Sequence, residues 1–335
     1  MNLTCPTDPV AANSIVQGRF ADKYIPQHVR LIISAESGAN DGLGFPFLFL
    51  AMYLMKYSTT AAITNWLLRI CLYQVLLSVV LGIAIGVIAR IALQFADQRK
   101  LIDTVNVLSF SISLSFFMMG IIGLLGSDDL LAIFIAGNVI SWDGWINTIY
   151  ENSMIQEVLD SLFNLTYFVF FGSIIPWGSF GTENLETWKL LLLGAGVLLL
   201  RRLPIVMALH GRFIPTLKTP REAAFSGFFG PIGVGAIFYA TIALKSIEAE
   251  EVNDGGKQFE TLQRILFPVV CFLVLASVII HGITVPLFHF SVETQKKLRA
   301  GSRMNVRRQD VATARSIDKV EGPLVFEEIE LISES

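Results

Sequence analysis

Long apolar stretches recur along this sequence and limit its folds more than any other feature. An α-helix needs about 20 apolar residues to cross the hydrocarbon core of a bilayer. Eight stretches reach or approach that length and a partial one opens the chain; they cover residues 1–17, 31–55, 65–93, 104–125, 128–142, 161–179, 187–210, 222–244 and 264–290. Backbone polar groups must pair internally within a bilayer, so the sequence predicts an all-α membrane protein, a multi-span helical bundle.

The composition supports this interpretation and excludes other classes. Of 335 residues, 53% are hydrophobic and 16% charged, against about 25% charged residues in soluble domains. The net charge of −3 gives no basic surface for nucleic acid. Cys5, Cys71 and Cys271 lack the spacing of a metal site and are expected to be packing residues. Because no Ser/His, Cys/His or metal-ligand set occurs, we expect neither an enzyme nor a cofactor.

The charges between the stretches indicate two regions and an orientation. We expect a transmembrane domain over residues 1–290, with about nine membrane segments, and a polar tail over 291–335. The tail is basic near the membrane and therefore cytoplasmic. The basic 201–221 connection then lies inside and the acidic 245–264 connection outside. The short 128–142 stretch could be a re-entrant hairpin, but a full span fits this charge balance better.

Carboxylates inside apolar stretches are the candidate functional residues, since each costs a few kcal/mol to place in a bilayer. The first group is Thr7-Asp8-Pro9. Pro9 removes a backbone donor, and a broken helix frees carbonyl groups that can coordinate a cation where they line a cavity. The alternative is a polar helix end, with Thr7 or Asp8 as the N-cap.

The second group lies within the 31–55 stretch. At helical spacing Ser37 and Asp41 share one face. A carboxylate buried there would keep its proton until a cation replaces it, and hard cations such as Na⁺ prefer carboxylate, hydroxyl and carbonyl oxygens. Asp41 is therefore the main candidate for binding a proton and a cation in turn; the alternative is a polar loop before the membrane. The whole group reads Glu36-Ser37-Gly38-Ala39-Asn40-Asp41-Gly42.

Two further groups leave alternatives open. Asp128 and Asp129 either form an outer cation funnel or cap a helix N-terminus, and capping alone is slightly favoured by the chemistry. Gly230-Pro231-Ile232-Gly233-Val234-Gly235 either interrupts the 222–244 helix or permits tight packing. Arg201 and Arg202 end an apolar run, which favours an anchor at the inner membrane face over an internal partner for a carboxylate.

These motifs resemble the monovalent cation/proton antiporter family. The Thr7-Asp8-Pro9 run and the Asn40-Asp41 pair match its paired core helices in type, order and spacing. Further stretches are similar to the fungal plasma-membrane Na⁺/H⁺ antiporters: Gly126-Ser127-Asp128-Asp129-Leu130-Leu131-Ala132, Phe171-Gly172-Ser173, Arg202-Leu203-Pro204 and Gly230-Pro231-Ile232-Gly233-Val234-Gly235. The resemblance covers about residues 3–290 and implies the sodium/proton antiporter fold with broken crossing helices.

The resemblance also implies a role for each candidate residue. Asp41 and Asp8 would bind the transported cation, Na⁺ with K⁺ or Li⁺ as further substrates, or the proton. Thr7 and Ser37 would add oxygen ligands, while Asn40, Glu36, Asp128 and Asp129 would support the site. The implied function is secondary active antiport for cation and pH homeostasis, in a multi-pass protein of the plasma membrane that contacts lipid.

The chain departs from the family pattern in two respects. Many relatives carry an arginine in the glycine-rich helix where this chain has Val234, which puts an internal arginine–carboxylate pair in question. Family members also have about four helices before the Thr-Asp-Pro helix, and these supply contacts of the homodimer. We therefore expect an N-terminally incomplete antiporter, and the alternative function is a truncated membrane fragment that does not transport.

Overall fold

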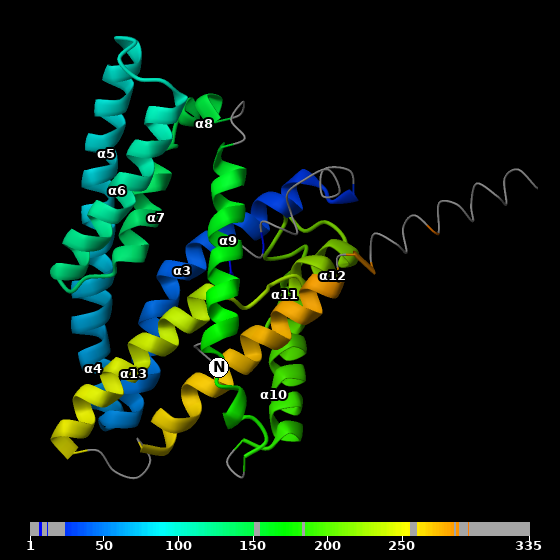
Figure 1. The fold of residues 1–335 in the computed structure, drawn as a ribbon. Coiled ribbons are helices and arrows are strands. Elements are labelled where there is room, and N and C mark those ends of the chain that lie inside the picture. The colour runs from blue at the N-terminus through cyan, green and yellow to red at the C-terminus, as the bar shows by residue number, and fades with distance from the viewer. Residues whose placement is uncertain are drawn as a thin grey trace, which may run out of the picture. The chain divides into compact units, whose positions relative to one another are not determined.

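The computed structural model describes residues 7, 8, 12, 24–150, 155–182, 185–254, 260–284, 286, 287 and 294. Within these residues the elements are helical, apart from one isolated β-bridge between His210 and Ile214. The chain divides into two compact units, Met1–Gly282 and Ile283–Ser335, and helices α3 to α13 lie in the first. The prediction of an all-α protein is therefore confirmed (Figure 1).

The helices follow the apolar stretches of the sequence. In chain order they are α3 (Gln27–Lys56), α4 (Thr59–Asn65), the π-helix η2 (Trp66–Val75), α5 (Leu76–Gln98), α6 (Thr104–Leu124), α7 (Asp129–Ile140), α8 (Trp145–Tyr150), α9 (Ile155–Ile174), the 3₁₀ turn η3 (Trp177–Ser179), α10 (Thr187–Leu200), α11 (Leu203–Leu209), α12 (Pro220–Phe228) and α13 (Val234–Asp254). A last apolar helix covers Glu260–Thr284.

Four helical segments of the described residues are long and apolar enough to cross a membrane. They are Thr59–Gln98, Thr104–Leu124, Thr187–Leu209 and Glu260–Thr284. The 128–142 stretch forms one helix, α7, rather than a hairpin. Twelve residues of α-helix rise only about 18 Å, so α7 is shorter than the hydrocarbon core. Of the partial stretch 1–17, only residues 7, 8 and 12 are described.

Two of the predicted stretches are interrupted. The glycine-rich segment breaks its helix, because α12 ends at Phe228 and α13 begins at Val234; residues 229–233, called the linker below, are not helical. The 187–210 stretch is interrupted between Leu200 and Leu203, which the sequence did not indicate. Pro204 explains this break, since proline disfavours a helical conformation before it and is well tolerated in the first turn of a new helix.

Glycines allow close packing among α5, α6 and α7, which lie side by side in Figure 1. A Cβ atom on Gly82 would lie 2.6 Å from the main-chain oxygen of Ala132, and one on Gly86 would lie 3.0 Å from Ala136 Cα. Helix α3 approaches α7 in the same manner, since a Cβ on Gly42 would lie 2.7 Å from Leu131 Cα. These contacts bring the polar part of α3 next to the start of α7.

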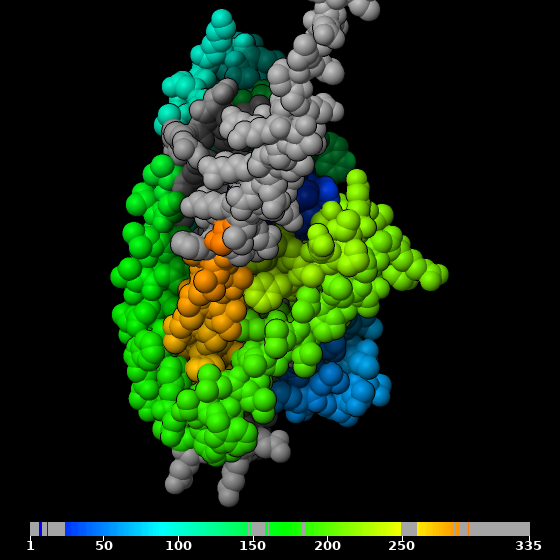
Figure 2. All heavy atoms as spheres, turned by 90° about the vertical axis from the view of Figure 1, so that its right-hand side faces the viewer, coloured from blue at the N-terminus to red at the C-terminus, as the bar shows by residue number. Residues whose placement is uncertain are grey.

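The helix Glu260–Thr284 packs against the broken segment. In Figure 2 this helix, in orange, lies beside the yellow-green segment that contains α11 and α12. His281 Nε2 lies 3.0 Å from the main-chain oxygen of Phe228, the residue at which α12 ends. An apolar core that includes Ile232, Ala236 and Val274 joins the linker and α13 to this helix. The linker is thus enclosed by protein, as irregular backbone at membrane depth must be.

Candidate cation-binding site

Helix α3 carries four of the predicted site residues. The Asn40 amide donates a hydrogen bond to Glu36 Oε1 at 3.4 Å, one helical turn away. Ser37 is fully buried, and its hydroxyl donates to the main-chain oxygen of Ser34 at 2.9 Å. This local bond uses the Ser37 proton and leaves lone pairs of the hydroxyl oxygen available.

Asp41 is held by its backbone rather than by its carboxylate. Its main-chain oxygen accepts a hydrogen bond from the Tyr239 hydroxyl of α13. The side-chain atom Oδ1 is buried, and no described residue donates a hydrogen bond to it. Since buried polar atoms are nearly always paired, this oxygen is suited to a proton or a cation as its partner.

Asp8 reaches the same region from the opening segment. Its main-chain N–H donates to the oxygen of Pro231 at 2.8 Å, and its carboxylate lies directly against Gly233, where a Cβ atom would overlap it. Asp8 is 1% exposed. The structure therefore places a second buried carboxylate of the predicted site, far in sequence from Asp41, against the linker.

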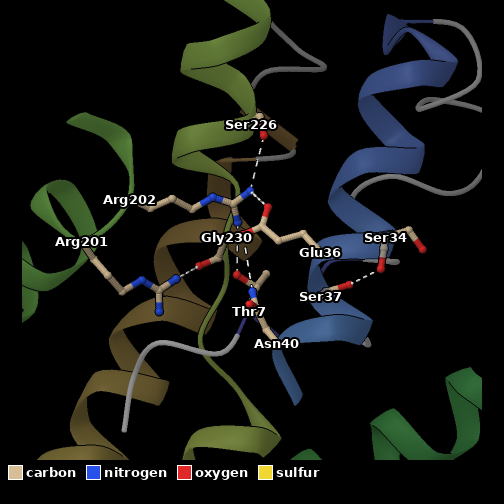
Figure 3. A network of polar contacts seen from close by, with 9 residues as sticks. All are labelled: Thr7, Ser34, Glu36, Ser37, Asn40, Arg201, Arg202, Ser226 and Gly230. Carbon is tan, nitrogen blue, oxygen red and sulfur yellow. Dashed lines mark hydrogen bonds and ion pairs between the residues drawn. The ribbon is translucent and has the colours of Figure 1, made fainter. Parts of the chain in front are cut away.

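A buried arginine pairs with another carboxylate of the predicted site, that of Glu36 (Figure 3). The Arg202 guanidinium pairs with the carboxylate of Glu36, and its Nη1 donates to Thr7 Oγ1 at 3.1 Å. Its Nη2 also lies 3.4 Å from Ser226 Oγ of α12. Only 9% of Arg202 is exposed. The pair joins α3, the opening segment and the start of α11 through charged hydrogen bonds.

The favoured interpretation of Arg202 as an anchor at the membrane face is therefore wrong. It is an internal partner for a carboxylate, the alternative that was considered less favourable. An internal arginine–carboxylate pair was in question because this chain has Val234 where many relatives have an arginine. Such a pair is present, and Arg202 supplies its positive charge. The break between α10 and α11 had a signal in the sequence. Two arginines stand between two apolar runs there, and Leu203-Pro204 follows them directly.

The linker fits closely around these groups because of its glycines. Arg201 Nη2 donates to the main-chain oxygen of Gly230 at 2.5 Å. A Cβ atom on Gly230 would lie 2.5 Å from Arg202 Nη1. Together with the contact of Gly233 and Asp8, this shows that a side chain at either glycine would displace a charged group of the site.

Two residues of the last helix also hold the linker, and no local sequence pattern indicated their contacts. Ser277 Oγ accepts a hydrogen bond from the Ile232 N–H at 2.7 Å. His281 Nδ1 lies 3.2 Å from Ser277 Oγ, while its Nε2 faces Phe228 oxygen. Both side chains are buried. Polar groups of the irregular backbone thus find partners inside the protein.

Asp128 and Asp129 lie at the beginning of α7. Asp128 is the N-cap, since its Oδ1 accepts a hydrogen bond from the Leu131 N–H at 3.0 Å. Asp129 is partly exposed and accepts from the Leu130 N–H at 2.9 Å. The capping interpretation is confirmed for Asp128. Asp128 Oδ2 is buried and receives no hydrogen bond from the described residues, so capping uses only half of this carboxylate.

Comparisons with known proteins give one consistent result. Residues 3–290 match the family model described as "Sodium/hydrogen exchanger, transmembrane". Na(+)/H(+) antiporter 2 of Zygosaccharomyces rouxii is 36% identical over 97% of this chain, and the Na(+)/H(+) antiporter of Saccharomyces cerevisiae is 40% identical over 84%. The Na(+)/H(+) antiporter of Schizosaccharomyces pombe is 33% identical over 83%. The chain spans 42%, 30% and 61% of the lengths of these three relatives.

Proposed function

This chain belongs to the sodium/hydrogen exchanger family, and we propose that it contains the ion-binding centre of an antiporter that exchanges Na⁺ for H⁺ across a membrane. The observation that supports the proposal is the burial of two carboxylate groups, with Asp8 against the linker and one oxygen of Asp41 enclosed beside α13. Asp41 has a buried oxygen to which no described residue donates. The family consists of transporters rather than enzymes.

The proposed exchange follows from competition for these carboxylates. Two carboxylates that repel each other are stabilised when a proton or a cation lies between them. Oxygen ligands suit hard cations, and Thr7 and Ser37 would supply further oxygens. Binding of Na⁺ would then release a proton, and protonation would release Na⁺. We extend the proposal to K⁺ and Li⁺ as competing substrates, because the same oxygen ligands bind them.

The remaining site residues would support this exchange. Arg202 neutralises Glu36, which in turn is hydrogen-bonded to Asn40, so that these groups hold α3 beside Asp8. Asp128 would keep α7 against Gly42, next to Asp41, through its N-cap. Asp129, partly exposed at the same helix start, would attract cations. These roles make Asp41 and Asp8 the exchanging groups and the others their supports.

The cellular setting is also part of the proposal. We propose a plasma-membrane location with residues 291–335 in the cytoplasm, a role in cation and pH homeostasis, and a homodimer surrounded by lipid. The Na⁺/H⁺ antiporter names of the fungal relatives and the basic residues that begin the tail support this setting.

We also propose a second candidate function, a membrane protein that holds the site but does not transport by itself. This candidate is considered because the chain spans 30% to 61% of the lengths of the three relatives. The two candidates differ in one property, which is whether the chain alone moves ions. An experiment must therefore test the chain both alone and within a complete relative.

Proton efflux from acid-loaded vesicles after addition of Na⁺ tests both candidates. We would compare the chain with a chimera in which it replaces the matching part of the Schizosaccharomyces pombe relative. Sodium-dependent efflux by the chimera, lost in Asp41→Asn, is the expected result. Asp103→Asn is the matched control, because Asp103 is exposed and caps no N–H of α6. Efflux by the chimera but not by the chain would select the second candidate. Efflux by the Asp41→Asn chimera would overturn the assignment of the site.

A further inference from the structure

Tyr239 links helix α13 to the backbone of the proposed ion-binding residue. It is 1% exposed and packs beside Leu48 and Ala243. Its hydroxyl donates a hydrogen bond to the main-chain oxygen of Asp41 in α3. A buried hydroxyl that reaches across to the backbone of another helix makes a contact that packing alone does not require.

The contact lies one residue before a missing backbone hydrogen bond of α3. In an α-helix the Asp41 oxygen accepts from the N–H of Phe45, and here the same oxygen accepts from the Tyr239 hydroxyl. The next residue, Pro46, lies within α3 and has no N–H to donate to the oxygen of Gly42. The Tyr239 hydroxyl therefore donates to the oxygen that normally closes the helical turn after Asp41.

A second contact from outside the helix fixes the other end of this turn. Trp66 Nε1, in η2, donates to the main-chain oxygen of Pro46 at 2.7 Å. The turn from Asp41 to Pro46 is thus held from one side by Tyr239 and from the other by Trp66. Its geometry depends on these neighbours because proline disrupts the bonds within the helix.

Tyr239 also connects Asp41 with the linker. It lies in α13, which begins at Val234, directly after the Gly233 that contacts Asp8. One continuous segment therefore touches Asp8 at its linker and the backbone of Asp41 at Tyr239. A displacement of this segment would change the position of Asp41 relative to Asp8.

We propose that Tyr239 is a positioning residue for cation binding, whose hydroxyl sets the backbone at Asp41 and thereby the distance between the carboxylates of Asp41 and Asp8. This inference rests on the proposed function, because it assumes that these carboxylates bind the cation. Tyr239 itself does not contact the ion. Its loss should therefore weaken binding without abolishing exchange.

Tyr239→Phe removes the hydroxyl and keeps the buried ring. Tyr73→Phe is the matched control, since the Tyr73 hydroxyl also donates to a main-chain oxygen, that of Leu125 at 2.9 Å, at an exposed position near the start of α7. One neutral hydrogen bond corresponds to about a two- to tenfold change in an equilibrium constant. We expect Tyr239→Phe to raise the KM for Na⁺ by about this factor, with the maximal rate nearly unchanged, and Tyr73→Phe to change neither.

A binding measurement separates this inference from the proposed function. The thermal stability of the purified chain is recorded against Na⁺ concentration, with choline as the inert cation. A parent that is stabilised by Na⁺ but does not transport overturns only the proposed function. A Tyr239→Phe variant with the parent's half-saturating Na⁺ concentration overturns the inference, as does a parent without any response to Na⁺. A variant that melts at the parent's temperature without Na⁺, yet needs more Na⁺ for stabilisation, supports it.

Discussion

Two regions of this protein are built by different kinds of contact. Around the linker, buried charged groups meet irregular backbone, as in the pair of Arg202 with Glu36 and the contact of Asp8 with Gly233. Between α5 and α7, backbone meets backbone through Gly82 and Gly86. The first region depends on charge and hydrogen-bond direction, and the second on the absence of side chains.

The difference separates the parts of the molecule that can exchange partners from those that cannot. A carboxylate or hydroxyl oxygen can exchange one hydrogen-bond donor for another, such as water, at a small net change in free energy, and the same oxygen can instead coordinate a cation. A glycine contact has no such substitute, because a larger residue needs the backbones to move apart. We therefore expect substitutions near the linker to alter ion binding as well as stability, and those between α5 and α7 to alter stability alone.

The largest expected effect comes from Arg202→Ala, which leaves the Glu36 carboxylate without its buried cation. Breaking a fully buried ion pair from one side costs about 3–5 kcal/mol, and we expect the lower end of this range because the Glu36 side chain is 36% exposed. We expect a large fall in the melting temperature of the purified protein and loss of its stabilisation by Na⁺. The double variant Arg202→Met with Glu36→Gln should regain much of the stability, because no unpaired charge remains. Equal melting temperatures for the single and double variants would contradict the role of this pair.

A smaller effect, confined to stability, is expected from Gly82→Ala. The new Cβ would lie 2.6 Å from the Ala132 oxygen and 3.0 Å from Ile135 Cβ, and overpacking of this kind costs about 1–3 kcal/mol. Gly120→Ala in α6 is the matched control, since its Cβ meets no atom within 4 Å, and it should stabilise the helix slightly. Melting temperatures measure both. If Gly82→Ala changed the half-saturating Na⁺ concentration instead, the division between the two regions would fail.

The same contrast explains what the sequence could predict. Hydropathy located the apolar helices, because burial in a bilayer requires about 20 apolar residues in succession. The break near Gly230-Pro231 was one of two predicted alternatives, since both residues weaken a helix locally. These are properties of neighbouring residues, and a single sequence displays them.

The contacts of the candidate site were less predictable because they join distant residues. Arg202 is separated from Glu36 by 166 positions, and the local pattern of two arginines at the end of an apolar run favoured an anchor. Tyr239 resembles any aromatic residue in an apolar helix until the fold brings it to Asp41. Asp8 and Asp41 were predicted as partners through a family resemblance, and the structure shows Asp8 against Gly233 and the Asp41 backbone bound by Tyr239.

The smallest expected effect concerns Asp128, which lies where the two regions meet. Its Oδ1 caps α7, while its Oδ2 receives no hydrogen bond from the described residues. Asp128→Ala should lower stability by about 1 kcal/mol through loss of the cap, and Asp128→Asn by much less, because asparagine caps helices nearly as well. Melting temperatures of the two variants, with Asp103→Asn as the control, test this order. If Asp128→Asn is as stable as the parent but needs more Na⁺ for half-saturation, the second oxygen of Asp128 contributes its charge to the cation site, and the boundary between the regions lies beyond α7.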